Sequence, residues 1–432
     1  MSERQNWWSI RRLAPPGATA TILCLLLFSG PPKFRIRSPE ASLNGHVDFA
    51  LLINILIWLA GGLWVAWRVW RAWRDRRSRI HLFLSHKFAA PVVILLGISV
   101  FVSIDPQLTA FKVFQIIVAL LFTSFFVELY GVDRFMNLLL IGSAVLCSLI
   151  VLCVAVAPDL VVFMTDTGYP RLRGEAIADA GVVAALGTIL LFTSARRLSL
   201  PTFLFLSALF GSVLIFSLAR IAWLAVAVFF AIAVLKRPAI RSMKWVYVFW
   251  VIVAVGVFAG AMGQLDMVRD PQSVSDLSGR LGLWAYLGTT TLGQSPWLGL
   301  GYLAASREIG MEYDPQLGSG HSIFIDVFVG GGIVTEIAFL VLVIAMIVYA
   351  IKLLRRKRDA NSFGAACLMI TVVLIGAVGA SIDSTPFGFI FWSLVTLLPL
   401  LNSLPDESRA PFALRMPAWP WPSAPPALDR SG

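Results

Sequence analysis

The chain has 432 residues, of which 58% are hydrophobic and only 14% are charged, and its formal net charge at pH 7 is +11. Soluble globular proteins use roughly half apolar and about a quarter charged residues, so this composition excludes an ordinary soluble enzyme, a disulfide scaffold and a disordered regulator. Apolar runs this long and numerous cannot all be hidden in one water-soluble core, and the chain is therefore predicted to be a membrane protein.

Apolar windows along the chain are each about 20 residues long, which is enough to cross roughly 30 Å of hydrocarbon. Twelve such windows lie at 14–30, 47–67, 88–104, 108–128, 135–157, 175–194, 199–217, 219–235, 245–262, 322–350, 363–380 and 386–402. The first window also fits a signal peptide, because Arg4, Arg11 and Arg12 precede a short apolar stretch. The predicted fold class is all-α, a polytopic integral membrane protein of about twelve transmembrane helices with one long outer loop.

Most of the 35 Lys and Arg residues fall on one side of the membrane when the spans alternate from a cytoplasmic N-terminus. They form runs at 68–79, 236–244 and 352–358, as the positive-inside rule expects of short cytoplasmic loops. Both termini are therefore predicted to be cytoplasmic. The positive net charge is explained by topology, and no nucleic acid is expected as a partner.

The longest loop, at 263–320, must then face the outside, where a polytopic enzyme would carry its chemistry. Within it, residues 281–292 are apolar and aromatic at helical spacing, which predicts a helix on or in the membrane surface. The predicted organisation is nine transmembrane helices at 1–262, this loop, three further helices at 321–402, and a Pro-rich cytoplasmic tail at 403–432 that is expected to be disordered.

The Cys and His residues do not indicate a metal or redox site. Cys24, Cys147, Cys153 and Cys367 all fall within predicted spans, where a buried free thiol is the ordinary state. The four His residues show no metal-ligand spacing, and no Gly-rich phosphate loop precedes a Lys-Ser or Lys-Thr pair. We therefore expect no metal, no cofactor and no ATP-driven pump.

Two arginines lie at positions where a positive charge is energetically unfavourable and therefore needs an explanation. Arg220 lies in the tight outer turn between two spans, and within lipid a charge costs roughly 2.5 to 3.5 kcal/mol on insertion scales. It is either a snorkelling anchor of the helix end or a guanidinium that lines a cavity for an anion. Arg280 follows Ser278 at the start of the predicted loop helix, with Trp284 one turn later. A cation at a helix N-terminus is mildly unfavourable unless an anion such as phosphate binds beside it, and a surface Arg without a ligand is the alternative.

His321 is the only His in the outer loop and stands at the start of the tenth span. Histidine is the default general base for a hydroxyl nucleophile, although a lone His is more often structural. Arg171 and Arg173 lie in the outer loop before the sixth span, where Glu175 is an alternative partner for either of them. The acidic residues that compete with His321 as the base are Asp266, Asp270, Asp276, Glu312, Asp314 and Asp326.

Four short motifs occur in order on the outer side. They are Ser-Leu-Ala-Arg ending at Arg220, Ser-Gly-Arg-x-x-x-Trp from Ser278 to Trp284, Pro-Trp-Leu-Gly-x-Gly from Pro296 to Gly301, and His321 leading into Gly330-Gly331-Gly332. Each motif alone is weak, but together they resemble the O-antigen ligase superfamily, which includes Wzy-type and exopolysaccharide polymerases. The resemblance covers roughly residues 171–351, and the twelve-span architecture fits the whole chain.

Members of this family are metal-independent transferases that act on glycans carried by undecaprenyl diphosphate at the periplasmic face of the bacterial inner membrane. The resemblance implies that Arg220 and Arg280 hold the diphosphate. It also implies that His321 deprotonates or orients the acceptor hydroxyl, with inversion at the anomeric carbon. The further candidate substrate-binding residues are Arg171, Arg173, Ser278 and Trp284.

The implied function is an exopolysaccharide or O-antigen polymerase, and the alternative is an O-antigen ligase that transfers the glycan to lipid A core. The expected partners are an undecaprenyl-diphosphate-linked oligosaccharide or polysaccharide, an acceptor glycan, and a chain-length regulator of the same pathway. A flippase or carrier of the lipid-linked glycan is the rival class. It would show ionisable residues deep within spans and broken helices in matching halves, and the sequence indicates few of the former.

Overall fold

The structure is a computed structural model that describes residues 17–30, 49–74, 86–164, 170–174, 177–236, 280–314, 320–356, 359–379 and 386–403. The described part is mostly helical. Several predicted features lie outside it, namely the ninth span at 245–262, the first part of the outer loop at 263–279, and the tail after Ser403.

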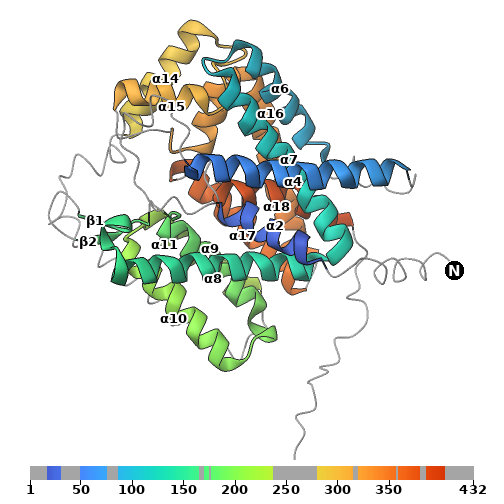
Figure 1. The fold of residues 1–432 in the computed structure, drawn as a ribbon, viewed down its shortest axis with the longest axis vertical. Helices are drawn as coiled ribbons and strands as arrows, with labels where there is room; N and C mark the ends of the chain where they lie inside the picture. Colours follow the sequence, from blue (N-terminus) through green and yellow to red (C-terminus); the bar gives the residue numbers. More distant parts are fainter. Residues whose placement is uncertain are drawn as a thin grey trace, which may run out of the picture.

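Figure 1 shows the order of the elements along the chain. They are α2 (Ala18–Ser29), α4 (Phe49–Arg74), α6 (Ala89–Ile98), η1 (Ser99–Val102), α7 (Pro106–Tyr130), α8 (Val132–Val156), η2 (Pro158–Leu160), β1 (Val162–Met164), β2 (Pro170–Leu172), α9 (Ala180–Ser194), η3 (Ala195–Arg197), α10 (Leu200–Ser217), α11 (Arg220–Lys236), α14 (Arg280–Gln294), α15 (Ala304–Tyr313), α16 (Ile323–Arg356), α17 (Ala360–Val378) and α18 (Phe387–Ser403).

Each predicted span except 245–262 overlaps one of these helices. Among the described residues, six helices are long and apolar enough to cross a membrane, and these are α4, α7, α8, α10, α16 and α17. The first window corresponds to α2, whose Phe28 is fully buried and makes an edge contact with Phe389 of α18. This packing favours a helix of the bundle over the signal-peptide alternative.

Side-chain caps fix where several of these helices begin. Asp105 accepts a hydrogen bond from the Leu108 N–H at 3.0 Å before α7, and Asp359 accepts one from the Ser362 N–H at 2.8 Å before α17. Each cap satisfies a backbone donor that the first helical turn leaves without a partner. Such caps matter near lipid, where water is scarce as a substitute.

The core of the bundle is formed by α9, α17 and α18. Every residue of α9 is buried, and α17 contacts α9, α11, α16 and α18. Gly187 of α9 lies against the ring of Phe210, and Gly364 of α17 lies against Thr193 of α9. Small residues at these positions let the helix backbones approach closely, which is how helices associate in lipid. The four cysteines are buried and form no disulfide, as expected from their positions in the spans.

The described part is mostly helical, consistent with the all-α prediction, and it adds a small antiparallel sheet of β1 and β2 in the loop before α9. Its register pairs Phe163 with Arg171. Three-residue strands carry too few residues to show an alternating pattern, so hydropathy could not predict them. The sheet brings Arg171 to the end of α10, where it enters the site described below.

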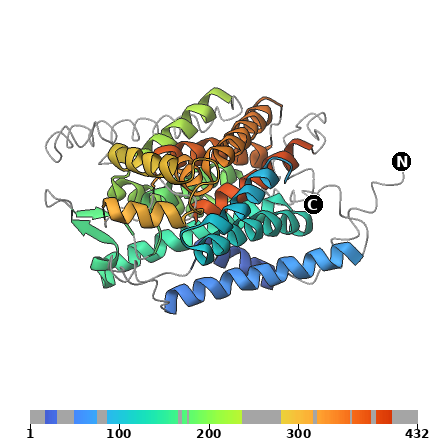
Figure 2. The same ribbon diagram turned by 90° about the horizontal axis from the view of Figure 1, so that it is seen from above.

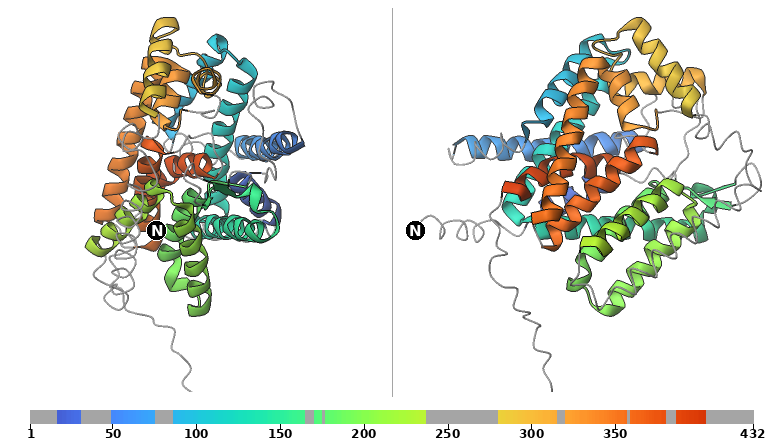
Figure 3. Two further views of the ribbon diagram at one scale, coloured as in Figure 1. Left: turned by 90° about the vertical axis from the view of Figure 1, so that its left-hand side faces the viewer. Right: turned by 180° about the vertical axis from the view of Figure 1, so that it is seen from behind.

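Two groups of helices lie on either side of α17 and α18. Figure 3 shows α14, α15 and α16 together with α6 on one side, and α8 to α11 on the other. The predicted loop helix at 281–292 is confirmed as α14, which buries Leu283, Leu287 and Thr291 along one face. Figure 2 shows α4 along the edge of the bundle.

Candidate functional site

Six of the seven candidate site residues are described, and Ser278 lies outside the described residues. Arg171 is on β2, and its Nε donates a hydrogen bond of 2.8 Å to the backbone carbonyl of Ser217, the last residue of α10. Leu218 then turns the chain with a φ of 50°, so that α11 begins at Arg220. Arg171 therefore binds the residue that precedes the turn leading to Arg220.

This turn is packed tightly against the start of α9. A Cβ on Gly181 would lie 2.4 Å from the Cβ of Ala219 and 3.0 Å from the Oγ of Ser217, so only glycine fits there. The hydroxyl of Ser217 also accepts a hydrogen bond from the Ala219 N–H at 3.3 Å. These contacts fix the position of the backbone next to Arg220. Arg173 is directed differently, since its guanidinium lies 5.3 Å from the ring centre of Phe163.

Arg280 reaches the same region from the opposite group of helices. Its Nη1 donates a hydrogen bond to the carbonyl of Val378, the last residue of α17. A cation is favourable at the negative end of a helix, and this contact offsets the unfavourable position of Arg280 at the start of its own helix. At the next residue, a Cβ on Gly379 would lie 2.7 Å from Ile221, the neighbour of Arg220. The C-terminal end of α17 thus brings Arg280 and Arg220 together.

Trp284 and His321 complete this arrangement. Trp284 lies one turn after Arg280, and its Nε1 donates a hydrogen bond of 2.7 Å to the carbonyl of Gly320. His321 follows with a φ of 50°, in the left-handed region that non-glycine residues rarely adopt. Two residues later, Ile323 packs on Gly376 of α17, where a Cβ would lie 2.7 Å from its Cγ2.

Arg280 thus binds the end of α17, Ile221 beside Arg220 packs on Gly379, and Trp284 binds Gly320 beside His321. Arg171 binds Ser217, just before the turn that leads to Arg220. Guanidinium groups bind phosphate oxygens in a planar fork, and imidazole exchanges protons near neutral pH. The neighbouring segments therefore carry residue types that can bind an anion and accept a proton.

A comparison of the sequence with known protein families indicates which family this part of the chain resembles. Residues 204–340 match the model of a family described as O-antigen ligase. This segment, less than half of the chain, is similar to the O-antigen ligase superfamily. The resemblance predicted from the motifs is confirmed, and with it an O-antigen ligase or polymerase type of membrane enzyme. A search of curated proteins found no match.

The O-antigen ligase match runs from α10 into α16 and includes Arg220, Arg280, Trp284 and His321. Arg171 and Arg173 precede it. The contact between Arg171 and Ser217 nevertheless ties β2 to the matched segment. This link could not be predicted from the sequence, since the two residues are 46 positions apart.

The glycine motifs of the O-antigen ligase segment have a structural role. Gly301 donates a backbone hydrogen bond of 3.0 Å to the carbonyl of Gly330. A Cβ on Gly299 would lie 2.5 Å from the backbone of Gly330, and one on Gly332 would lie 2.4 Å from that of Trp297. The motifs therefore let a loop and a helix touch backbone to backbone, as expected from their composition.

The predicted span at 322–350 is not one continuous helix, because α16 is interrupted at Gly332 with a φ of 71° and a ψ of −174°. Only glycine adopts this conformation readily. The interruption separates a short first part, which begins next to His321, from the longer remainder of α16. It places the backbone of Gly332 against the loop after α14.

Among the acidic alternatives to His321, Asp326 is fully buried and its Oδ1 accepts a hydrogen bond of 3.1 Å from the Gly320 N–H. It thus supports the backbone beside His321. Glu312 and Asp314 lie at the end of α15. Asp266, Asp270, Asp276 and Glu175 lie outside the described residues. In the described part of the chain, no three His, Cys, Asp or Glu side chains gather as metal ligands.

One residue was missed by the sequence analysis. Glu336 lies near the middle of α16, and its Oε2 is buried without a hydrogen-bond partner among the described residues. The signal was present in the sequence, because Glu336 is an ionisable residue within an apolar run. It has the position that a carrier would use for a proton relay.

Proposed function

We propose that the protein is a multi-pass glycosyltransferase of the bacterial inner membrane, with both termini in the cytoplasm. It transfers a glycan from undecaprenyl diphosphate to an acceptor sugar hydroxyl at the periplasmic face, as an exopolysaccharide or O-antigen polymerase. The observation that supports this proposal is that Arg280 binds the end of α17, where Gly379 packs on Ile221 beside Arg220.

The chemistry needs only these groups. The acceptor hydroxyl oxygen attacks the anomeric carbon while its proton passes to His321. The bond from that carbon to the diphosphate oxygen breaks, and its electron pair leaves with the diphosphate. Arg220 and Arg280 stabilise the charge that develops there, and a single displacement inverts the anomeric carbon. No metal and no cofactor take part in this scheme.

Purified protein in nanodiscs, with an undecaprenyl-diphosphate-linked glycan as donor, tests the proposal. Loss of one charge-stabilising group is expected to reduce the rate by about 10²- to 10³-fold in Arg220→Ala and in Arg280→Ala. His321→Ala is expected to lose about 10²- to 10⁴-fold. The rate is expected to be unchanged by a metal chelator.

Arg197→Ala is the matched control. Arg197 is an exposed arginine in η3, with an ion pair of 2.7 Å to Asp133. An exposed ion pair contributes only about 0–1 kcal/mol, so this variant should keep the wild-type rate. Wild-type rates from all three site variants, at normal protein levels in the membrane, would contradict the site.

The product distinguishes the polymerase from the ligase. A lengthened lipid-linked chain identifies the polymerase, whose chain lengths a regulator of the same pathway would set. Transfer of the glycan to lipid A core identifies the ligase.

A carrier of the lipid-linked glycan is the second candidate, and two observations favour it. These are the interruption of α16 at Gly332 and the buried carboxyl group of Glu336. A proton relay requires a group that titrates, so Glu336→Gln should abolish transport by a carrier. In a transferase the same variant should leave the rate of glycosidic bond formation unchanged. Detergent solution has no separate compartments, so a carrier has nothing to transport between. A carrier would also form no new glycosidic bond there.

A further inference from the structure

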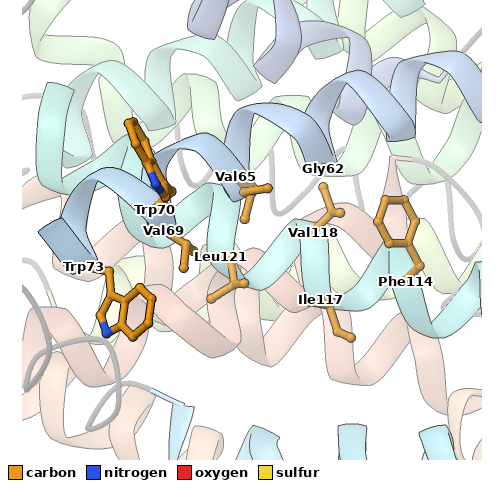
Figure 4. Close-up of a pocket in the computed structure, with 10 residues that line it drawn as sticks. Gly62, Val65, Val69, Trp70, Trp73, Phe114, Ile117, Val118 and Leu121 are labelled. Atoms are coloured by element: carbon orange, nitrogen blue, oxygen red, sulfur yellow. The ribbon is translucent and has the colours of Figure 1, made fainter.

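A groove of about 440 Å³ lies between α4 and α7. It is lined by Gly62, Ala66 and Val69 of α4 and by Phe114, Ile117 and Leu121 of α7, among other apolar residues. Figure 4 shows the lining side chains arranged from Phe114 at one end to Trp73 at the other. Its volume lies within the roughly 300–1,000 Å³ that pockets for small molecules have.

Small residues keep the groove open. A Cβ on Gly62 would lie 2.5 Å from the Cζ of Phe114, so any larger residue there would collide with the wall. Ala66 follows one turn later on the same helix and is exposed. The walls offer almost no hydrogen-bonding groups apart from the indole N–H groups of Trp70 and Trp73. A hydrocarbon chain is the ligand that such walls accept.

One end of α4 combines aromatic and cationic side chains. Trp70 and Trp73 are 57% and 70% exposed. The guanidinium of Arg74 lies 5.9 Å from the ring centre of Trp70, and that of Arg71 lies 5.6 Å from Trp67. Trp and Arg at a helix end are typical of the boundary between membrane and water. Arg fits a phosphate group at that level.

This end of α4 is remote from the proposed active site. Figure 1 shows β1 and β2 at one end of the helices and the projecting end of α4 at the other. The basic run at 68–79 gives the projecting end a cytoplasmic position by the positive-inside rule. The cytoplasmic leaflet carries anionic phospholipids, which attract such a cluster.

We propose that the groove between α4 and α7 binds an acyl chain of an anionic phospholipid of the cytoplasmic leaflet, whose phosphate is held by Arg71 and Arg74. The charge of these arginines requires an anionic headgroup at this end. An undecaprenyl diphosphate bound at the end of α17 would have its headgroup at the opposite face. The lipid site is therefore separate from the proposed donor site.

Native mass spectrometry of the purified full-length protein tests the proposal, with phosphatidylglycerol and phosphatidylcholine as probes. The wild type should retain phosphatidylglycerol in preference to phosphatidylcholine. Ala66→Trp, which fills the groove, should lose the bound lipid. Leu63→Trp is the matched control, because Leu63 is 73% exposed on the same helix and does not line the groove. It should retain the lipid.

The double variant Arg71→Gln with Arg74→Gln leaves the groove itself unchanged. It therefore tests the proposal even if Ala66→Trp fails to fold. Loss of each arginine should weaken phosphatidylglycerol binding about fivefold, equivalent to about 1 kcal/mol, so Arg71→Gln with Arg74→Gln should lose about 25-fold. Lys352→Gln, an exposed cation at the cytoplasmic end of α16, should not change binding.

Four results would overturn the proposal. Equal retention of both phospholipids would show an unselective crevice. Undiminished binding in Ala66→Trp and in Arg71→Gln with Arg74→Gln would place the lipid elsewhere. Displacement of phosphatidylglycerol by equimolar undecaprenyl phosphate would assign the groove to the isoprenoid. Retention of no lipid by the wild type would show that another segment or protein covers it.

Discussion

The hydrogen bond from Trp284 to Gly320 provides a sharp test of how His321 is positioned. Trp284→Phe keeps an aromatic ring but removes the N–H that lies 2.7 Å from the Gly320 carbonyl. Gly320 is buried, so its carbonyl cannot turn to water for a replacement. A buried acceptor left without a donor costs about 1–3 kcal/mol. If that free energy holds His321 in place, the rate should fall by about 5- to 150-fold.

The assay is the initial rate of glycosidic bond formation by purified protein in nanodiscs. The loss should appear mainly in kcat, because Arg220 and Arg280 still bind the donor in the proposed scheme. Trp297→Phe is the matched control, since Trp297 is 64% exposed in the same outer region. It should keep the wild-type kcat.

Two results would refute this reasoning. A wild-type kcat in Trp284→Phe would show that the bond to Gly320 does not position His321. A lower yield of folded protein with an unchanged kcat per molecule would show that the bond serves folding alone.

Two further predictions concern stability. Gly332→Ala should destabilise the protein by about 2–6 kcal/mol, because a left-handed backbone and overpacking each cost about 1–3 kcal/mol and the new Cβ would lie 2.4 Å from the backbone of Trp297. Its thermal midpoint and membrane level should fall, whereas Gly97→Ala, with open space around its Cβ, should change neither greatly. Burial raises the pKa of Glu308 above its ordinary value of 4.5, and the negative charge of Asp105 raises it further. The positive charge of Arg307 lowers this pKa and so reduces the shift. The folded state therefore holds this proton more tightly than the unfolded state, and this contribution to stability is lost as the pH rises above 4.5. Glu308→Gln should thus raise the thermal midpoint at neutral pH and lose this advantage in acid.

A gain for Glu308→Gln that is the same at acid and neutral pH would contradict the electrostatic explanation. For Gly332, an unchanged midpoint in the alanine variant would mean that the loop after α14 yields at little cost.

Much of the helical architecture could be predicted from hydropathy, because each span must satisfy its own backbone hydrogen bonds in lipid. The window at 175–194 predicted α9, which begins at Ala180. The amphipathic spacing at 281–292 predicted α14 to within two residues. The order of the outer motifs also predicted the family that the comparison confirmed.

Other features depend on partners far away in the sequence. Hydropathy predicted 322–350 as one helix, because a single glycine barely changes the average over a window. The interruption at Gly332 is set by the loop backbone that packs on it. Glu336 was likewise hidden by its apolar neighbours, and its burial follows from the packing of α16 rather than from its own residue type.

The sequence by itself determined the membrane class of the protein and the residue types of the candidate site, and it predicts that the basic loops are cytoplasmic. These depend on local composition, which acts through transfer into lipid and through the charge of short loops. Only the tertiary structure decided that Arg280 binds the end of α17, 98 positions away, and that Arg171 meets the turn before Arg220. Such contacts arise from the packing of whole helices and an intervening strand. A local sequence pattern therefore cannot predict which distant carbonyl a guanidinium group will bind.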